Sequence, residues 1–111
     1  MTYTINGKQW TEFDINKRCA EFIPVAINEN QDASLKAKSH SVLINDIINT
    51  YEYNPCQNPS DTWPIIEKCW DELMEIIAND GAWVNWDYLK YKHNCTKLAA
   101  ACICFIEENE A

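Results

Sequence analysis

Residues 60–77 read SDTWPIIEKCWDELMEII, and their apolar members recur at the spacing of one α-helical face. These members are Ile66, Cys69, Trp70, Leu73, Ile76 and Ile77. Ser60 is a favourable N-cap, Asp61 meets the positive end of the helix dipole, and Pro64 falls in the first turn. Residues 79–81, Asn-Asp-Gly, supply a stop signal. We therefore expect one long helix whose apolar stripe enters the core.

The N-terminal residues predict a hairpin followed by a shorter helix. Asn6-Gly7 is a strong turn signal between two short runs, residues 3–5 and 8–10. Thr11 is a suitable N-cap with Asp14 three residues later, so a helix is expected over residues 12–22. Its apolar stripe would contain Phe13, Cys19 and Ala20, with Ile23 just beyond it. Pro24 then ends the helix, because the residue before a proline disfavours the α region.

The remaining segments predict strands and one more helix. β-Branched and aromatic residues over 41–44 and 47–53 indicate two strands joined by a turn at Asn45-Asp46, and residues 25–27 would add an edge strand. Residues 28–32 are polar and loop-like. Residues 83–91 alternate as a strand, with Val84, Trp86 and Tyr88 on one face. Asn94 would cap a last helix over residues 95–108, with an apolar stripe of Leu98, Cys102 and Phe105 beside Ala101 and Ile106.

Together these elements predict one α+β domain over residues 1–111, in which a small antiparallel sheet packs against about three helices. Apolar residues make up 47% of the chain, which is enough for a core without disulfides or a structural metal. No apolar run approaches the roughly 20 residues that span a bilayer. The first residues do not combine a basic segment with an apolar one, so we expect no secretory signal and a cytoplasmic location.

The formal net charge of −8 disfavours direct binding of DNA or RNA, because carboxylates repel phosphates. Six cysteines are present, but no CxxC pair occurs, and the spacing Cys102-x-Cys104 fits neither a zinc knuckle nor a thioredoxin-like site. His40 and His93 lie far from any paired cysteine in the sequence. We therefore expect buried free thiols, with Cys69, Cys95 and Cys102 facing apolar surroundings, and neither a metal nor another cofactor.

Three stretches resemble the NinX-like family of small bacteriophage and prophage proteins. They are residues 54–68 (NPCQNPSDTWPIIEK), the closing helix with Asn94, Leu98-Ala99-Ala100-Ala101 and Phe105, and residues 13–17 (FDINK). Residues 23–50 show no clear match, and the helix after Pro64 is longer than in the family pattern. The family has no established activity. The resemblance implies an accessory gene of a phage or prophage that is expressed in the host bacterial cytoplasm.

Two groups of residues are candidates for binding a protein partner. In the loop before the long helix, Asn54, Asn58 and Asp61 could hydrogen-bond a partner and Trp63 could anchor it, although the same residue types are what turns and caps require. On the helix, like charges repeat every four residues, which costs a few tenths of a kcal/mol per pair. They are Glu67, Asp71 and Glu75, with Glu72 beside them. Such carboxylates could imitate phosphates, or they could simply form a solvated helix face.

Other sites have weaker support. Trp83, Trp86, Tyr88 and Tyr91 lie within nine residues and could stack on nucleic acid, but core packing explains most of them. Only Cys56 or Cys95 with His93 could be drawn as a nucleophile and its base, and we expect no enzyme.

The sequence therefore favours a phage accessory protein that binds a host or phage protein complex. Inhibition of a host defence complex by nucleic-acid mimicry, like an anti-CRISPR protein, is the specific hypothesis. A cysteine-dependent enzyme and a structural homo-oligomer, including a homodimer, are the alternatives.

Overall fold

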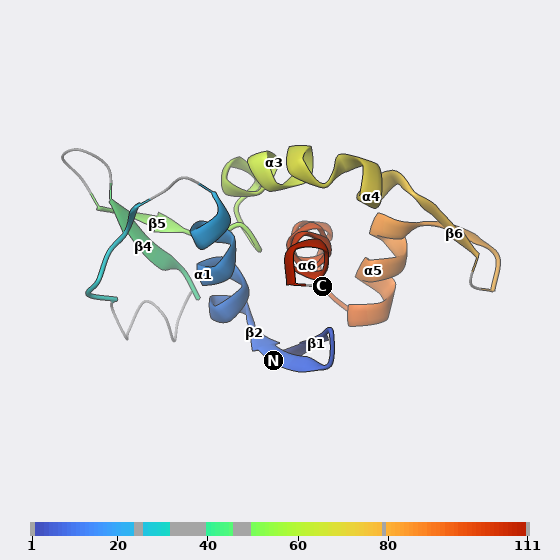
Figure 1. Cartoon of the computed structure of the whole chain (residues 1–111), viewed down its shortest axis with the longest axis horizontal. Coiled ribbons are helices and arrows are strands. Elements are labelled where there is room, and N and C mark those ends of the chain that lie inside the picture. Colours follow the sequence, from blue (N-terminus) through green and yellow to red (C-terminus); the bar gives the residue numbers. More distant parts are fainter. Residues whose placement is uncertain (1, 24–25, 32–39, 46–49, 79, 111) are drawn as a thin grey trace.

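The computed structural model describes residues 2–23, 26–31, 40–45, 50–78 and 80–110. Its architecture is a ring of elements around one central helix, α6 (Lys97–Glu110), which is viewed end-on in Figure 1. Around it lie α1 (Glu12–Phe22), α3 (Pro59–Lys68) and α5 (Asn85–His93). The strands of the described residues form three small antiparallel sheets, so the predicted α+β class is confirmed.

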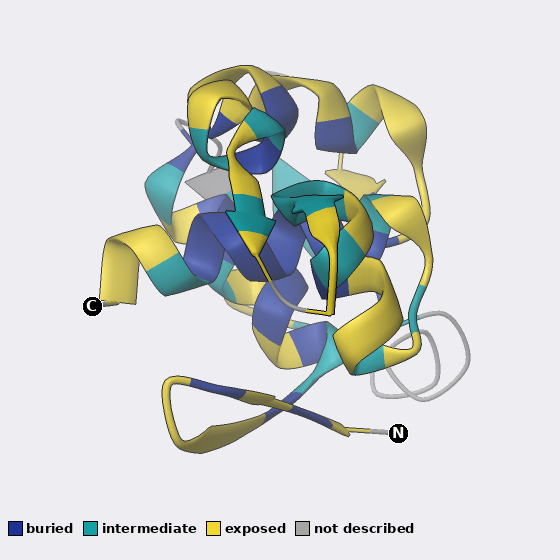
Figure 2. Ribbon diagram, turned by 90° about the vertical axis from the view of Figure 1, so that its right-hand side faces the viewer, coloured by how far each residue is buried: buried dark blue, intermediate teal, exposed yellow. Residues whose placement is uncertain are grey.

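The central helix is buried around its whole circumference. All eight residues from Ala99 to Ile106 are buried, as the dark middle part of α6 in Figure 2 shows. A helix that is apolar on every side belongs in an interior, and its alanines and cysteines are small enough for neighbouring helices to approach closely. The predicted stripe was therefore too narrow, and its first member, Leu98, is only half-buried.

The start of α6 also differs from the prediction. Asn94 does not cap α6, because it lies in the left-handed region (φ 49°, ψ 55°) and ends α5 instead. The Thr96 hydroxyl accepts a hydrogen bond from the Ala99 N–H at 3.1 Å, so threonine provides the N-terminal cap. Thr96 lies two positions after the predicted cap, and the left-handed turn at Asn94 moves the start of the helix to it.

The N-terminal prediction is confirmed. β1 (Thr2–Ile5) and β2 (Lys8–Thr11) pair as an antiparallel hairpin around Asn6 and Gly7, which both have positive φ. Thr11 then caps α1 with a complete capping box. Its hydroxyl accepts from the Asp14 N–H at 3.1 Å, and the Asp14 carboxylate accepts from the Thr11 N–H at 3.0 Å. The predicted stripe is buried, and Ile15 and Asn16 are buried with it.

A three-stranded sheet packs beside α1 (Figure 1). It consists of β3 (Ala26–Ile27), β4 (Val42–Asn45) and β5 (Thr50–Tyr53) in that order, so the predicted edge strand and strand pair are confirmed. Asn45 is not a turn residue, because it pairs with Thr50 inside the sheet. Val25 and Asp46, which belonged to the predicted edge strand and turn, lie outside the described residues.

The long helix predicted over residues 60–77 is wrong in its length and in its cap. The observed helix α3 begins at Pro59, and its N-cap is Asn58. Pro64 therefore lies inside α3 rather than in its first turn. Cys69, with φ −119° and ψ 25°, separates α3 from the short α4 (Trp70–Met74). The inner face survives this break, since Ile66, Cys69 and Leu73 are all buried as predicted.

The end of the predicted long helix is a strand. Residues 76–78 form β6 (Ile76–Ala78), which pairs with β7 (Ala82–Val84) in a hairpin that projects beyond the helices (Figure 1). Asp80 and Gly81 both have positive φ, so they belong to a hairpin turn and not to a helix stop. Asn79 lies outside the described residues. The two adjacent isoleucines favour β structure, and Ile76 is 63% exposed, not in the core.

The strand predicted over residues 83–91 is also wrong for most of its length. β7 ends at Val84, and α5 begins at Asn85. The alternating aromatic residues suggested a period of two, but within α5 only Leu89 is fully buried, against α6. Packing on the central helix overrides the β propensity of the aromatic residues here.

Candidate functional site

The polar residues of the loop before α3 hold the chain's own backbone. The Asp61 carboxylate accepts from the Asn54 N–H at 3.0 Å, and the Asn58 side chain accepts from the Ser60 N–H at 3.1 Å. The Asn54 side-chain oxygen accepts from the amide of Asn16 at 2.8 Å. These bonds support the turn-and-cap interpretation of Asn54, Asn58 and Asp61. Partner binding by them remains a prediction.

The predicted carboxylates lie on α3, on α4 and just after α4. Glu67, Asp71 and Glu75 are exposed, whereas Glu72 is half-buried. None of the four forms an ion pair with another described residue. The break at Cys69 does not remove them from the surface. The structure therefore brings four carboxylates to one segment, three of them exposed, and no described cation forms an ion pair with them.

Two tryptophans accompany these carboxylates. Trp63 is 56% exposed and Trp70 is 47% exposed. With Glu67 they line a surface depression of about 310 Å³, which we call the Trp63–Trp70 notch. Trp63 was predicted as a site residue, but Trp70 was assigned to the core stripe, and that assignment is wrong. The break at Cys69 places Trp70 outside while Cys69 stays buried, and the sequence gives no clear signal of that break.

The Trp70 ring is supported by a neighbouring indole. It meets the Trp86 ring edge-on, with 6.4 Å between ring centroids. The Trp86 indole N–H donates to the Lys97 carbonyl at 2.7 Å, and the Lys97 ammonium lies 4.7 Å from the centre of the same indole. Trp86 is therefore fixed to the first residue of α6. One wall of the notch is held in place by this contact.

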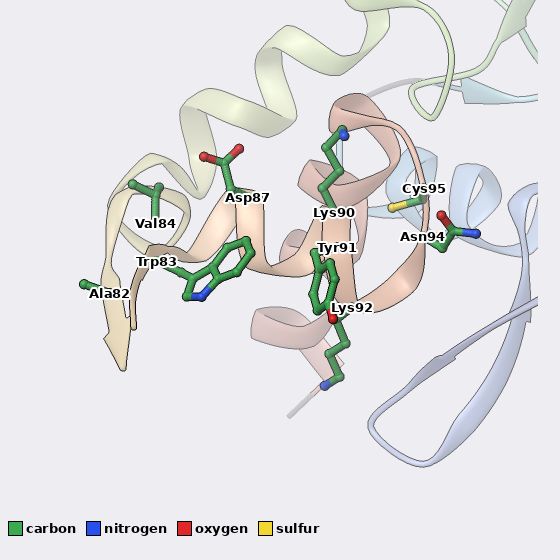
Figure 3. Close-up of a pocket in the computed structure, with 9 residues that line it drawn as sticks. All are labelled: Ala82, Trp83, Val84, Asp87, Lys90, Tyr91, Lys92, Asn94 and Cys95. Atoms are coloured by element: carbon green, nitrogen blue, oxygen red, sulfur yellow. The ribbon is translucent and has the colours of Figure 1, made fainter. Parts of the chain in front are cut away.

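A second depression, of about 950 Å³, lies on α5 and β7 (Figure 3). Its aromatic residues face each other, since the rings of Trp83 and Tyr91 lie 5.4 Å apart at an angle of 31°. Lys90 and Lys92 belong to the last turn of α5, where cations interact favourably with the helix dipole. Intramolecular contacts thus account for the ring pair and the charges. Core packing, which the sequence favoured for Trp83, Trp86, Tyr88 and Tyr91, is wrong as an explanation, because none of the four is buried. Tyr91 is nevertheless 71% exposed.

The six cysteines are free thiols, and all except the half-buried Cys95 are buried. Burial raises the pKa of Cys95 to about 11. A hydrogen bond with Cys102 lowers the pKa of Cys56, but burial and negative neighbours raise it above the ordinary value. Burial also lowers the pKa of His93. Thiols with raised pKa values are poor nucleophiles near neutral pH, because the thiolate is the reactive form.

The described residues contain no group of three His, Cys, Asp or Glu side chains placed to share a metal ion. Nor does any helix in the described part of the chain combine the length and the apolar character required to cross a bilayer.

Comparison with known proteins gives one result. The model of a protein family described as "Bacteriophage P22, NinX" matches residues 8–109. The match covers nearly the whole chain, including residues 23–50, for which the motifs alone showed no clear similarity. No curated protein and no solved structure matches.

Proposed function

Because the chain belongs to the bacteriophage P22 NinX family, we propose that it is a phage accessory protein that acts by binding another protein. The binding surface in this proposal is the exposed side of α3 and α4. It consists of the Trp63–Trp70 notch and the carboxylates Asp71 and Glu75.

The exposure of two large indole rings that line one depression is the observation that carries the proposal. Tryptophan is the residue most enriched at the energetic centres of protein interfaces, where it fills a pocket of the partner. Large apolar side chains that are exposed together are costly in water, and such patches mark interaction sites. Polar and charged residues usually surround such a centre. Asp71 follows Trp70 directly in the chain and Glu75 follows α4, and both are exposed.

We propose further that the partner is a nucleic-acid-binding complex of the host, such as a defence complex. The argument is one of charge. Glu67, Asp71 and Glu75 are exposed and have no described cationic partner, and the whole chain carries a formal charge of −8. A channel that binds phosphates is lined with Lys and Arg, so an acidic surface of this kind complements it and would compete with nucleic acid. Direct binding of DNA or RNA is not part of the proposal.

The test begins with capture of a partner from lysates of several bacterial hosts, followed by affinity measurement with purified components. The variant reverses the charge of three helix carboxylates, with the substitutions Glu67→Lys, Asp71→Lys and Glu75→Lys. The control has the same net charge but is changed at exposed positions elsewhere, with Glu29→Lys, Glu52→Lys and Glu108→Lys. We expect the variant to bind at least about tenfold more weakly than the control, and the wild-type affinity to fall with added salt.

Equal affinity of the variant and the control would reject phosphate mimicry by these carboxylates. A second variant, Trp63→Ala with Trp70→Ala, separates the two parts of the surface. If it keeps full affinity, the indoles are not the centre of the interface and the proposed surface is wrong. Circular dichroism of each variant checks that the fold is intact.

The absence of a catalytic role belongs to the same proposal. A cysteine-dependent enzyme is the alternative, and the raised pKa values of Cys56 and Cys95 argue against it. A purely structural homo-oligomer is the other alternative. It would appear in light scattering as a stable assembly of identical chains that captures no further protein.

A further inference from the structure

We infer that the Trp63–Trp70 notch binds an arginine side chain of the partner, with the guanidinium against the indoles and paired with the Glu67 carboxylate. This inference rests on the proposed function, because it specifies the chemistry of the partner at the same surface. Two exposed indoles alone would be compatible with any apolar side chain of a partner. The position of the carboxylate between them makes the site selective.

The three residues line one depression on the surface. Trp63 and Glu67 are four residues apart in α3, which is the spacing of neighbours on one helical face. Trp70 joins them from beyond the break at Cys69, as the first residue of α4. A cation seated in the depression meets both indoles and the Glu67 carboxylate, and cation–π attraction operates within roughly 6 Å of a ring.

Charge determines what kind of group fits. Glu67 has no ion-pair partner among the described residues, and the adjacent Lys68 does not line the notch. An apolar side chain seated between the indoles would remove water from this carboxylate without pairing it, which is unfavourable. A phosphate or a carboxylate would be repelled by Glu67 and by the nearby Asp71. A cation is attracted by both the ring faces and the carboxylate.

The same part of the molecule already contains a contact of this type. The Lys97 ammonium lies over the Trp86 ring, and the Trp86 ring contacts the Trp70 ring edge-on. Among the described residues, cations lie over the rings of Trp10, Phe22 and Trp86 and not over Trp63 or Trp70, so the notch can take a cation from outside. Because Trp70 is held in place before binding, less conformational entropy is lost when a ligand binds.

Arginine fits this site better than lysine. The guanidinium is planar, so it stacks on an aromatic face, and its forked N–H groups match a carboxylate. It is also more weakly hydrated than an ammonium group. Arginine is a common residue in phosphate-binding channels, which agrees with the class of partner proposed above.

The inference can be tested with short peptides, because the partner itself is not needed. The probes are acetyl-Gly-Arg-Gly-amide, its lysine counterpart, and its citrulline counterpart, which keeps the planar shape of arginine without the charge. Nitrogen-15 NMR follows the five indole N–H signals while each peptide is added to about 20 mM at constant ionic strength. Trp63→Phe and Trp70→Phe assign the two signals of interest, and Trp10 and Trp83 serve as internal references, whereas Trp86 contacts Trp70 and is followed as a neighbour of the site.

We expect the arginine peptide to shift the Trp63 and Trp70 signals saturably, with a smaller effect of the lysine peptide and none of the citrulline peptide. Glu67→Gln should weaken binding of the arginine peptide about fivefold, as expected for loss of one exposed ion pair. The matched control Glu108→Gln should have no effect. Equal shifts from arginine and citrulline, or arginine shifts no larger at Trp63 and Trp70 than at Trp83, would overturn the inference.

The results also separate this inference from the proposed function. If no peptide binds at the notch while the double tryptophan variant no longer binds its protein partner, the binding surface is correct and the arginine assignment is wrong. If the arginine peptide binds as expected while the double tryptophan variant keeps full affinity for the captured partner, the notch binds arginine but the proposed interface is wrong.

Discussion

Asn16 is fully buried, and its side-chain amide joins three segments that are distant in sequence. Its nitrogen donates to the His40 carbonyl at 3.0 Å and to the Asn54 side chain at 2.8 Å, while its oxygen accepts from the Cys56 N–H at 3.1 Å. These bonds fix the loop before α3 to α1. One buried amide therefore ties the chain just before the α3–α4 segment to α1.

Replacing Asn16 with alanine should lower the free energy of unfolding by about 3 kcal/mol, because several buried polar groups would lose their hydrogen bonds. Urea denaturation monitored by circular dichroism measures the change. Asn109→Ala is the control, since the exposed Asn109 side chain donates to the Phe105 carbonyl of its own helix. This control should lower the free energy of unfolding by no more than about 0.5 kcal/mol. A loss below about 1 kcal/mol for Asn16→Ala would show that water or a rearranged loop replaces these bonds.

Cys95 is the half-buried thiol, and its pKa of about 11 determines its reactivity. The thiolate fraction at neutral pH is then very small and increases about tenfold for each pH unit until the pH reaches the pKa. We therefore expect slow alkylation of the native protein at pH 7, an increase with pH, and loss of the first labelled site in Cys95→Ser. Mass spectrometry counts the labels.

The five buried thiols should react only when the protein is unfolded in denaturant. Rapid and selective alkylation of one thiol of the native protein at pH 7 would contradict this expectation and favour the cysteine-dependent enzyme instead.

At the scale of elements, the junctions determine the fold more than the elements themselves. Asn94 ends α5 in the left-handed conformation, with its N–H bonded to carbonyls of the last turn. The chain can then reverse direction, so that α6 packs back against α5. Cys69 and Glu75 similarly interrupt the segment that an apolar period alone would have kept helical.

Asn94→Gly should leave the free energy of unfolding unchanged or raise it slightly, because glycine adopts positive φ without strain. Asn94→Ala should lower it by about 1 kcal/mol, since a residue with a Cβ atom and no local polar side chain is strained there. Urea denaturation of the two variants measures the difference. If both substitutions destabilise equally, the asparagine side chain matters at this junction rather than its backbone conformation.

At the scale of the whole molecule, α6 is the common contact of the other helices. It packs against α1, α3, α4 and α5, and also against β1. Ala100 is fully buried within this helix. Its small side chain lets the surrounding helices approach the α6 backbone closely.

Ala100→Leu should lower the free energy of unfolding by about 1–3 kcal/mol, because the added methyl groups do not fit a closely packed interior. Ala82→Leu adds the same volume at an exposed position of β7 and should change stability by less than about 0.5 kcal/mol. Chemical denaturation of both variants makes the comparison. A harmless Ala100→Leu would indicate unfilled space beside α6.

Local chemistry in the sequence was sufficient where one short segment specifies its own conformation. Asn6-Gly7 forms the expected hairpin turn, and Thr11 with Asp14 forms the expected capping box. The pairing of β4 with β5 followed from β-branched and aromatic residues. In the candidate site, the sequence identified Trp63 and the exposed carboxylates, because charged residues at helical spacing rarely belong in a core.

Tertiary structure alone decided the rest, because burial depends on which neighbours cover a face and not on the residues of that face. Four helices enclose α6, so its whole circumference is apolar and the predicted stripe of Leu98, Cys102 and Phe105 was too narrow. Packing on α6 made a helix of residues with high β propensity in α5. The break at Cys69 turned Trp70 from an expected core residue into a wall of the notch. The period of a sequence describes a single regular element, and it cannot show where contacts with other elements interrupt that element.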